Sequence, residues 1–132
     1  MVVKTVEKNL LPAPQSVFVN SPGFGSGVLI SADGKVLTAA HVVQAADKVE
    51  VEFIDGQVAP AKVISSVPNA DVAMLKLDWV PYNAKPAKLG DSDTLQVGDD
   101  VFIIGAPYGI SHSLSVGHVS ARRKPKGGQW AL

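Results

Sequence analysis

The sequence contains no cysteine, which excludes disulfide bonds and metal sites built on thiolates. It also lacks any run of about 18 uncharged apolar residues, so no membrane-spanning helix is predicted. Lysine and arginine balance aspartate and glutamate, 12 against 12, and the sequence pI is about 6.8. Because such a chain has no overall field to attract polyanions, neither nucleic acid nor an anionic membrane is predicted as a partner.

The N-terminus lacks the features of a signal peptide. Charged residues at Lys4, Glu7 and Lys8 interrupt the apolar residues, and no apolar core of sufficient length follows. As written, no segment directs export. We predict that residues 1–15 form an arm, with a helical turn over residues 6–11, that docks on the fold.

Residues 16–78 have the pattern of a small β-domain. Six strands are predicted, over residues 17–19, 27–31, 35–39, 48–54, 58–65 and 71–77. The turn signals between them include Asn20-Ser21-Pro22-Gly23, Asp33-Gly34 and Asp55-Gly56. Hairpin connections and little helix favour an all-β fold in which these six strands close into an antiparallel barrel.

The remaining residues predict an incomplete second barrel. Residues 79–97 are interpreted as a crossover, residues 98–121 as a first hairpin, and residues 122–132 as a basic flexible tail. Two strands do not close a barrel, so the hairpin would present an apolar face and an unpaired edge. We expect it to pair with another chain, to fold back onto the first barrel or to be poorly ordered.

His41 is the first candidate catalytic residue. It follows the apolar strand Val36-Leu37-Thr38-Ala39-Ala40. A polar imidazole is unusual at the end of a buried strand. Histidine side chains have an unperturbed pKa near ~6.5 and can take and return a proton at neutral pH. The alternative is a packed histidine whose hydrogen bonds are satisfied, so the functional interpretation needs a second residue.

Asp71 is that second residue. It stands at the start of the apolar strand Val72-Ala73-Met74-Leu75-Lys76-Leu77, where a carboxylate is costly unless it is paired. A turn-forming aspartate after Pro68-Asn69 is the alternative. Taken together, the two residues predict that Asp71 accepts a hydrogen bond from Nδ1–H of His41 and leaves Nε2 free to deprotonate a hydroxyl.

Two further patterns suggest ligand sites, and neither is adopted. Gly23-Phe24-Gly25-Ser26-Gly27 precedes a strand and lacks the spacing of a nucleotide-binding loop; its glycines instead indicate close backbone packing at a barrel corner. His112 and His118 have no nearby cluster of carboxylates that would complete a metal site. No cofactor and no metal are predicted.

Several segments resemble the HtrA/Deg family of trypsin-like serine proteases, in the order and near the spacing of that family. They are Gly25 to Val43, Asp71 to Leu77, Leu89-Gly90-Asp91-Ser92, Val97-Gly98-Asp99 and Gly105-Ala106-Pro107-Tyr108-Gly109. The resemblance runs from about Val17 to Ser120. It implies that His41 and Asp71 match the catalytic histidine and aspartate of the family.

The resemblance also marks what these 132 residues do not contain. The family's nucleophile lies in a Gly-Asn-Ser-Gly-Gly type segment of the second barrel, and no such segment occurs here. The oxyanion hole and the specificity pocket come from the same region. None of the serines at positions 26, 111, 113, 115 and 120 has the family's flanking glycines in the Gly-Asn-Ser-Gly-Gly order.

The sequence therefore predicts a fragment of an HtrA-type serine endopeptidase that carries the catalytic histidine and aspartate and is inactive by itself. The resemblance implies an unfolded polypeptide as substrate and an extracytoplasmic or periplasmic location. The alternative is a non-catalytic module that binds a peptide or partner chain by strand addition. A homo-oligomer formed through the exposed hairpin is a related expectation.

Overall fold

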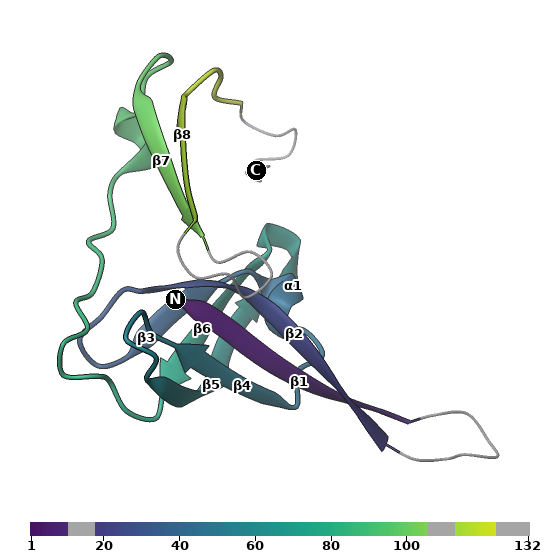
Figure 1. The fold of residues 1–132 in the computed structure, drawn as a ribbon. Coiled ribbons are helices and arrows are strands. Elements are labelled where there is room, and N and C mark those ends of the chain that lie inside the picture. The colour runs from purple at the N-terminus through teal and green to yellow at the C-terminus, as the bar shows by residue number, and fades with distance from the viewer. Residues whose placement is uncertain (11–17, 106–112, 124–132) are drawn as a thin grey trace.

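The computed structural model describes residues 1–10, 18–105 and 113–123 and contains two antiparallel sheets (Figure 1). The larger is a closed barrel with the strand order β1-β2-β3-β6-β5-β4. Its strands are β1 (Val2–Leu10), β2 (Phe18–Leu29), β3 (Lys35–Thr38), β4 (Lys48–Glu52), β5 (Val58–Val67) and β6 (Val72–Leu77). The predicted all-β fold with a six-stranded antiparallel barrel is confirmed.

The smaller sheet pairs β7 (Asp100–Gly105) with β8 (Ser113–His118). Helical structure in the described part of the chain consists of three short elements, α1 (Ala40–Val43), η1 (Pro68–Ala70) and η2 (Ser92–Thr94). None of the helices there has the length and apolar character needed to cross a bilayer.

The barrel contains six strands, but its first strand is not the predicted one. Residues 2–10, predicted as a docking arm with a helical turn, form β1, which pairs with both β2 and β4. Val3 and Thr5 are buried and Lys4 forms an ion pair with Glu52 on β4. This two-residue alternation is the period of a half-buried strand, with Lys4 on the side opposite to Val3 and Thr5.

The predicted turn at residues 20–23 is also absent. The segments 17–19 and 27–31, predicted as separate strands, are joined in the single long strand β2, and Pro22 lies opposite Val6 of β1. β3 pairs with β2 only from Gly27 to Leu29. Residues 18–26 of β2 therefore have β1 as their ladder partner, and no other strand of the described ranges pairs with their second edge. A proline is tolerated on such an edge because its missing N–H breaks no ladder hydrogen bond.

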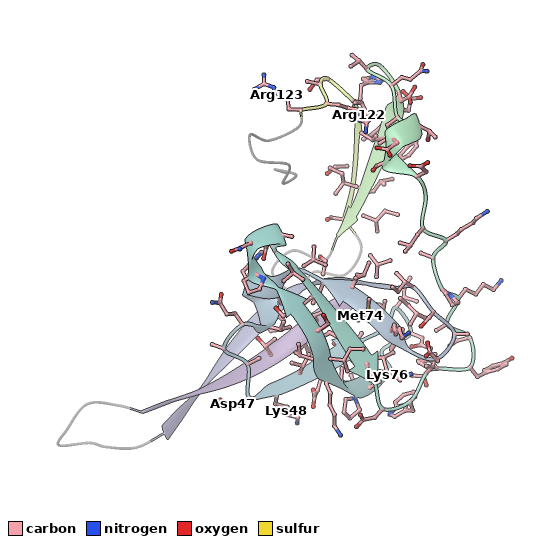
Figure 2. All side chains as sticks on the ribbon, turned by 180° about the vertical axis from the view of Figure 1, so that it is seen from behind. Asp47, Lys48, Met74, Lys76, Arg122 and Arg123 are labelled. Atoms are coloured by element: carbon pink, nitrogen blue, oxygen red, sulfur yellow. The ribbon has the colours of Figure 1, made fainter. Side chains whose placement is uncertain are left out.

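Alternation along the strands builds the core. In β6 the residues Ala73, Leu75 and Leu77 are buried, while Met74 and Lys76 between them, both labelled in Figure 2, are partly exposed. The buried apolar residues are Val3, Leu29, Val36, Ala40, Val43, Val49, Val51, Phe53, Ala59, Ala73, Leu75 and Leu77. All six strands contribute to this core, and so does α1.

Two predicted hairpin turns are confirmed. Gly34 has a φ of 98° and joins β2 to β3, where the N–H of Ile30 donates to the carbonyl of Lys35 at 2.9 Å. Gly56 has a φ of 86° and joins β4 to β5. Glycine has no Cβ, so it adopts these positive φ values without strain.

The second sheet is fastened to the connector that precedes it. The guanidinium of Arg122 donates to the backbone carbonyls of Asp93 and Leu95 at 3.2 and 3.3 Å, and its Nη2 lies 3.3 Å from Asp93 Oδ1. Arg122 was predicted to begin a flexible tail, whereas its side chain binds the turn at η2. Residues 124–132 of that tail lie outside the described residues.

Candidate active site

His41 lies in α1, the short helical turn that follows β3. The sequence predicts a strand running to residue 39 and a helical turn over 44–47, whereas β3 ends at Thr38 and α1 begins at Ala40. Ala40 and Val43 are buried in the barrel and anchor the turn, and the His41 side chain between them is 71% exposed. The turn thus presents the imidazole at the surface of the barrel.

Asp71 is held by a turn of unusual backbone geometry. It caps η1 and precedes β6, with φ 52° and ψ 42°, in the left-handed region. Its N–H donates to the carbonyl of Pro68 at 3.0 Å. Aspartate is among the few non-glycine residues that tolerate this conformation, so the same residue closes the turn and supplies the carboxylate.

One carboxylate contacts His41 at two points. Asp71 Oδ1 accepts a hydrogen bond from the backbone N–H of His41 at 2.8 Å, and Asp71 Oδ2 lies 2.7 Å from the imidazole Nδ1. An ionised carboxylate can only accept, so Nδ1 carries the hydrogen and Nε2 keeps its lone pair. The predicted contact is present, together with a backbone contact that the sequence did not predict.

The same contacts keep the carboxylate ionised. The pKa of Asp71 is lowered below the usual aspartate value, chiefly because the backbone N–H of His41 donates to it and next because the imidazole does. Desolvation acts in the opposite direction and is outweighed. An Asp71 that remains anionic can fix the imidazole tautomer and stabilise an imidazolium beside it.

The pair lies on an open surface. Asp71 has a side-chain exposure of 45%. A cavity of about 380 Å³ is found elsewhere, between the end of β2 and the connector; its lining includes Leu29, Phe53, Ala84 and Ile104 but neither His41 nor Asp71. The residues that line this cavity therefore form no pocket around His41 and Asp71.

Other residues considered from the sequence lie on other elements of the fold. His118 Nδ1 is 2.9 Å from Asp100 Oδ1 across the β7–β8 ladder, a pairing that sequence reasoning missed. Within the described ranges, no three His, Asp or Glu side chains gather as metal ligands would. Ser113 and Ser115 lie on β8, and Ser26 lies on β2. His112 and Ser111 are outside the described residues.

The local signals that were missed are visible in hindsight. Ala39-Ala40 favours helix over strand, which indicates that the strand ends before His41.

The glycines of residues 23–27 were expected to allow two backbones to approach. They do allow close packing, but against side chains: a Cβ at Gly27 would lie 2.9 Å from methyl carbons of Val3 and Val36.

Comparison with known families gives this geometry its context. The sequence profile described as "Trypsin-like peptidase domain" matches residues 25–131, a range that includes both His41 and Asp71. The chain belongs to the trypsin-like peptidase family.

Similar sequences place this trypsin-like peptidase beside the DegP-like proteins. It is 47% identical over 98 residues to a "Probable periplasmic serine endoprotease DegP-like" of Pseudomonas putida, covering 74% of this chain and 20% of that protein. It is 40% identical over 109 residues to a "Probable periplasmic serine protease do/HhoA-like" of Haemophilus influenzae, covering 82% of this chain and 23% of that protein. The chain thus spans about a fifth of the length of the curated relatives it matches.

Solved structures agree. The HtrA-type protease AlgW, determined with a decapeptide, superposes with a TM-score of 0.77 at 29% identity, covering 97% of this chain and 44% of that chain. AlgW with a tripeptide gives a TM-score of 0.76 at 31% identity, covering 96% and 38%. This member of the trypsin-like peptidase family is therefore of the HtrA type and corresponds to the N-terminal part of the protease domain.

Proposed function

We propose that His41 and Asp71 are the general base and the orienting acid of an HtrA-type serine endopeptidase. The observation that carries the proposal is the two-point contact, in which one carboxylate binds both the backbone N–H and the Nδ1 of His41. Membership of the trypsin-like peptidase family supports it, because this arrangement is the base-and-orienter half of a serine-protease triad.

The chemistry follows from the tautomer. With hydrogen on Nδ1, Nε2 of His41 takes the proton of a serine hydroxyl as that oxygen attacks the peptide carbonyl. The imidazolium then gives this proton to the leaving amine when the peptide C–N bond breaks. Asp71 stays ionised throughout, holds the ring in place and stabilises the imidazolium.

The nucleophile is proposed to come from a Gly-Asn-Ser-Gly-Gly type segment, which these 132 residues do not contain. We propose that the 132-residue chain by itself does not hydrolyse peptides. The nucleophile and the donors of an oxyanion hole supply several orders of magnitude in rate, and the histidine and aspartate cannot replace them.

A fusion tests the catalytic roles. This chain is joined to the segment that follows the matched region in the P. putida relative, and casein cleavage is measured. We expect the fusion to be active and His41→Ala to reduce kcat by roughly 10⁴-fold or more, with Asp71→Asn close to 10⁴-fold. His118→Ala is the matched control and should keep full activity. Equal activity in the His41→Ala and control fusions would contradict the assignment.

The 132-residue chain alone tests the proposed inactivity. It is incubated with a serine-directed fluorophosphonate, weighed intact by mass spectrometry and assayed for casein cleavage. We expect neither an adduct nor cleavage. A stoichiometric adduct would mean that one of the serines of this chain is a working nucleophile.

The proposed substrate is unfolded polypeptide, and the proposed location is the periplasm. The relatives from P. putida and H. influenzae are named as periplasmic, and AlgW was determined with short peptides. The fusion should cleave an unfolded protein faster than the same protein in its folded state. Fractionation of cells that express the gene should recover the protein with periplasmic markers; recovery with cytoplasmic markers would contradict the location.

A second candidate function is partner binding by strand addition, and the β7–β8 sheet favours it. The side chains of Phe102, Ile104, Leu114 and Val116 are 63–69% exposed, and the register places them on one face. Such a face with unpaired edges can bind a strand of another chain, including a second copy of this one. Light scattering over a concentration series tests self-association, and a chain that is monomeric throughout would contradict the homo-oligomer.

A further inference from the structure

The ladder between β2 and β3 ends three residues before His41. Its last pair is Gly27 with Thr38. The Thr38 side chain is only 8% exposed, and its hydroxyl donates to the backbone carbonyl of Ser26 at 2.8 Å. This bond ties the end of β3 to β2 one residue beyond the last ladder pair, at the point where the chain turns into α1.

The α1 turn cannot fix its own position. It has four residues, and Ala39 at its N-cap provides no side-chain hydrogen bond. A single helical turn is marginal without tertiary contacts, because the cost of nucleation is not repaid by further turns. The place and orientation of α1, and with it of His41, must therefore be set by contacts outside the turn.

Gly25 of β2 provides one such contact. A Cβ at this position would lie 2.6 Å from both γ-carbons of Val42, closer than side chains can approach. Val42 is the neighbour of His41 and is partly buried against the core. The absence of a side chain at residue 25 therefore lets α1 lie directly on β2.

We propose that Thr38, together with the contact between Gly25 and Val42, positions His41 for its hydrogen bonds to Asp71. The inference rests on the proposed function, because it concerns how the same catalytic pair is held. Asp71 must reach two atoms of His41, the backbone nitrogen and Nδ1, and both move with α1. A small displacement of α1 would break the two-point contact, and misplacement of about 1 Å suffices to impair catalytic groups.

The tautomer of His41 tests the role of Thr38 in the 132-residue chain itself. Long-range ¹H–¹⁵N correlation of the ring measures the fraction of the Nδ1–H form at a pH where the ring is neutral. Thr38→Val removes the hydroxyl, and we expect a shift from the Nδ1–H form toward the Nε2–H form of a free imidazole. Thr38→Ser keeps a hydroxyl and should keep the wild-type tautomer. Thr5→Val makes the same change at a buried position of β1 and is the matched control.

A second set of variants tests the contact beneath α1. Gly25→Ala places a methyl group against Val42 and should shift the tautomer in the same direction as Thr38→Val. Val42→Ala removes the γ-methyl groups, so the double variant should regain much of the wild-type tautomer. No rescue in the double variant, with a barrel that remains folded by its amide spectrum, would argue against this contact.

Asp71→Asn separates the failure of this inference from that of the proposed function. If Asp71→Asn changes the tautomer of His41 and Thr38→Val does not, the catalytic pair stands and the positioning role of Thr38 is overturned. If Asp71→Asn itself leaves the tautomer unchanged, the proposed pair fails. Should Thr38→Val not fold, the Gly25 and Val42 variants decide the question.

Discussion

The barrel and the β7–β8 sheet are built from similar ladders but differ in what they bury. Leu75 in the barrel is completely inaccessible, whereas Ile104 of β7 is 69% exposed although it too is a large aliphatic residue on a strand. Both sheets are antiparallel. The difference is closure: six strands enclose their inner face, and two strands cannot (Figure 1).

This comparison shows that an apolar strand does not by itself make a core. Burial of apolar area contributes about 25 cal/mol per Å². Among the described residues, the buried apolar core consists of residues of the barrel strands, of α1 and Phe53, and it includes no residue of β7 or β8. The proposed catalytic pair is attached to the barrel, since His41 follows β3 and Asp71 precedes β6. A site fixed on such a scaffold keeps its geometry without help from the second sheet.

The largest expected effect is on the free energy of unfolding, when a large aliphatic residue is truncated in the barrel and in the second sheet. Leu75→Ala should lower the free energy of unfolding of the barrel by about 2–5 kcal/mol, because it leaves a cavity in a closed core. Ile104→Ala should change it by less than ~0.5 kcal/mol, since the side chain is largely solvated already. Urea denaturation measures both, and equal effects of the two substitutions would contradict the contrast.

The same contrast explains how much of the fold the sequence predicts. Barrel closure, the second sheet and the turns at Gly34 and Gly56 follow from alternation and turn residues, which are local signals. The role of residues 2–10 does not, because β1 is inserted between β2 and β4, and its pairing with β4 joins residues that are distant in sequence. Tertiary pairing also overrides the turn signal around Pro22.

For the site, residue types were easier to predict than backbone. His41 and Asp71 stand out in the sequence because polar groups at the ends of apolar strands are costly unless they are hydrogen-bonded or paired. The left-handed backbone of Asp71 and the second contact to the N–H of His41 depend on how η1 and α1 meet in space. Likewise, nothing in the sequence distinguishes Thr38 from other strand residues, because the bond from its hydroxyl to Ser26 depends on how β3 meets β2.

A smaller effect is expected on the stability that Asp71 contributes to the barrel when the pH is lowered. The folded-state pKa of Asp71 lies below its unfolded value of about 3.9, so its stabilising contribution is present above that value and is lost as the pH falls through the folded pKa. Asp71→Asn should therefore be less stable than the wild type at pH 7, with a difference that shrinks below about pH 4.

Urea denaturation at a series of pH values checks this prediction. Asp100→Asn is the matched control in the second sheet, where the carboxylate meets one exposed ring nitrogen. Its effect on barrel unfolding should be smaller than that of Asp71→Asn at neutral pH. A constant difference between Asp71→Asn and the wild type from pH 7 to pH 3 would contradict the linkage.

The smallest effect is expected from the second histidine–aspartate pair. The distance from the imidazole Nδ1 to the carboxylate is 2.9 Å in the His118–Asp100 pair and 2.7 Å in the His41–Asp71 pair. The two histidines are similarly exposed, and Asp100 is more exposed than Asp71. Exposed ion pairs contribute about 0–1 kcal/mol, so His118→Ala should leave barrel unfolding unchanged and only increase amide exchange along β8.

The two histidines can be compared in one spectrum of the wild-type chain. Asp71 accepts from both the backbone and the ring of His41, whereas the contact recorded for Asp100 is with the ring of His118 alone. The imidazole of a histidine whose backbone N–H is also bound loses less conformational entropy when it pairs with the carboxylate. His41 should therefore show a larger fraction of the Nδ1–H tautomer than His118. Equal fractions would mean that the backbone contact adds nothing to the orientation of the imidazole, and that proximity of a carboxylate alone sets the tautomer in both regions.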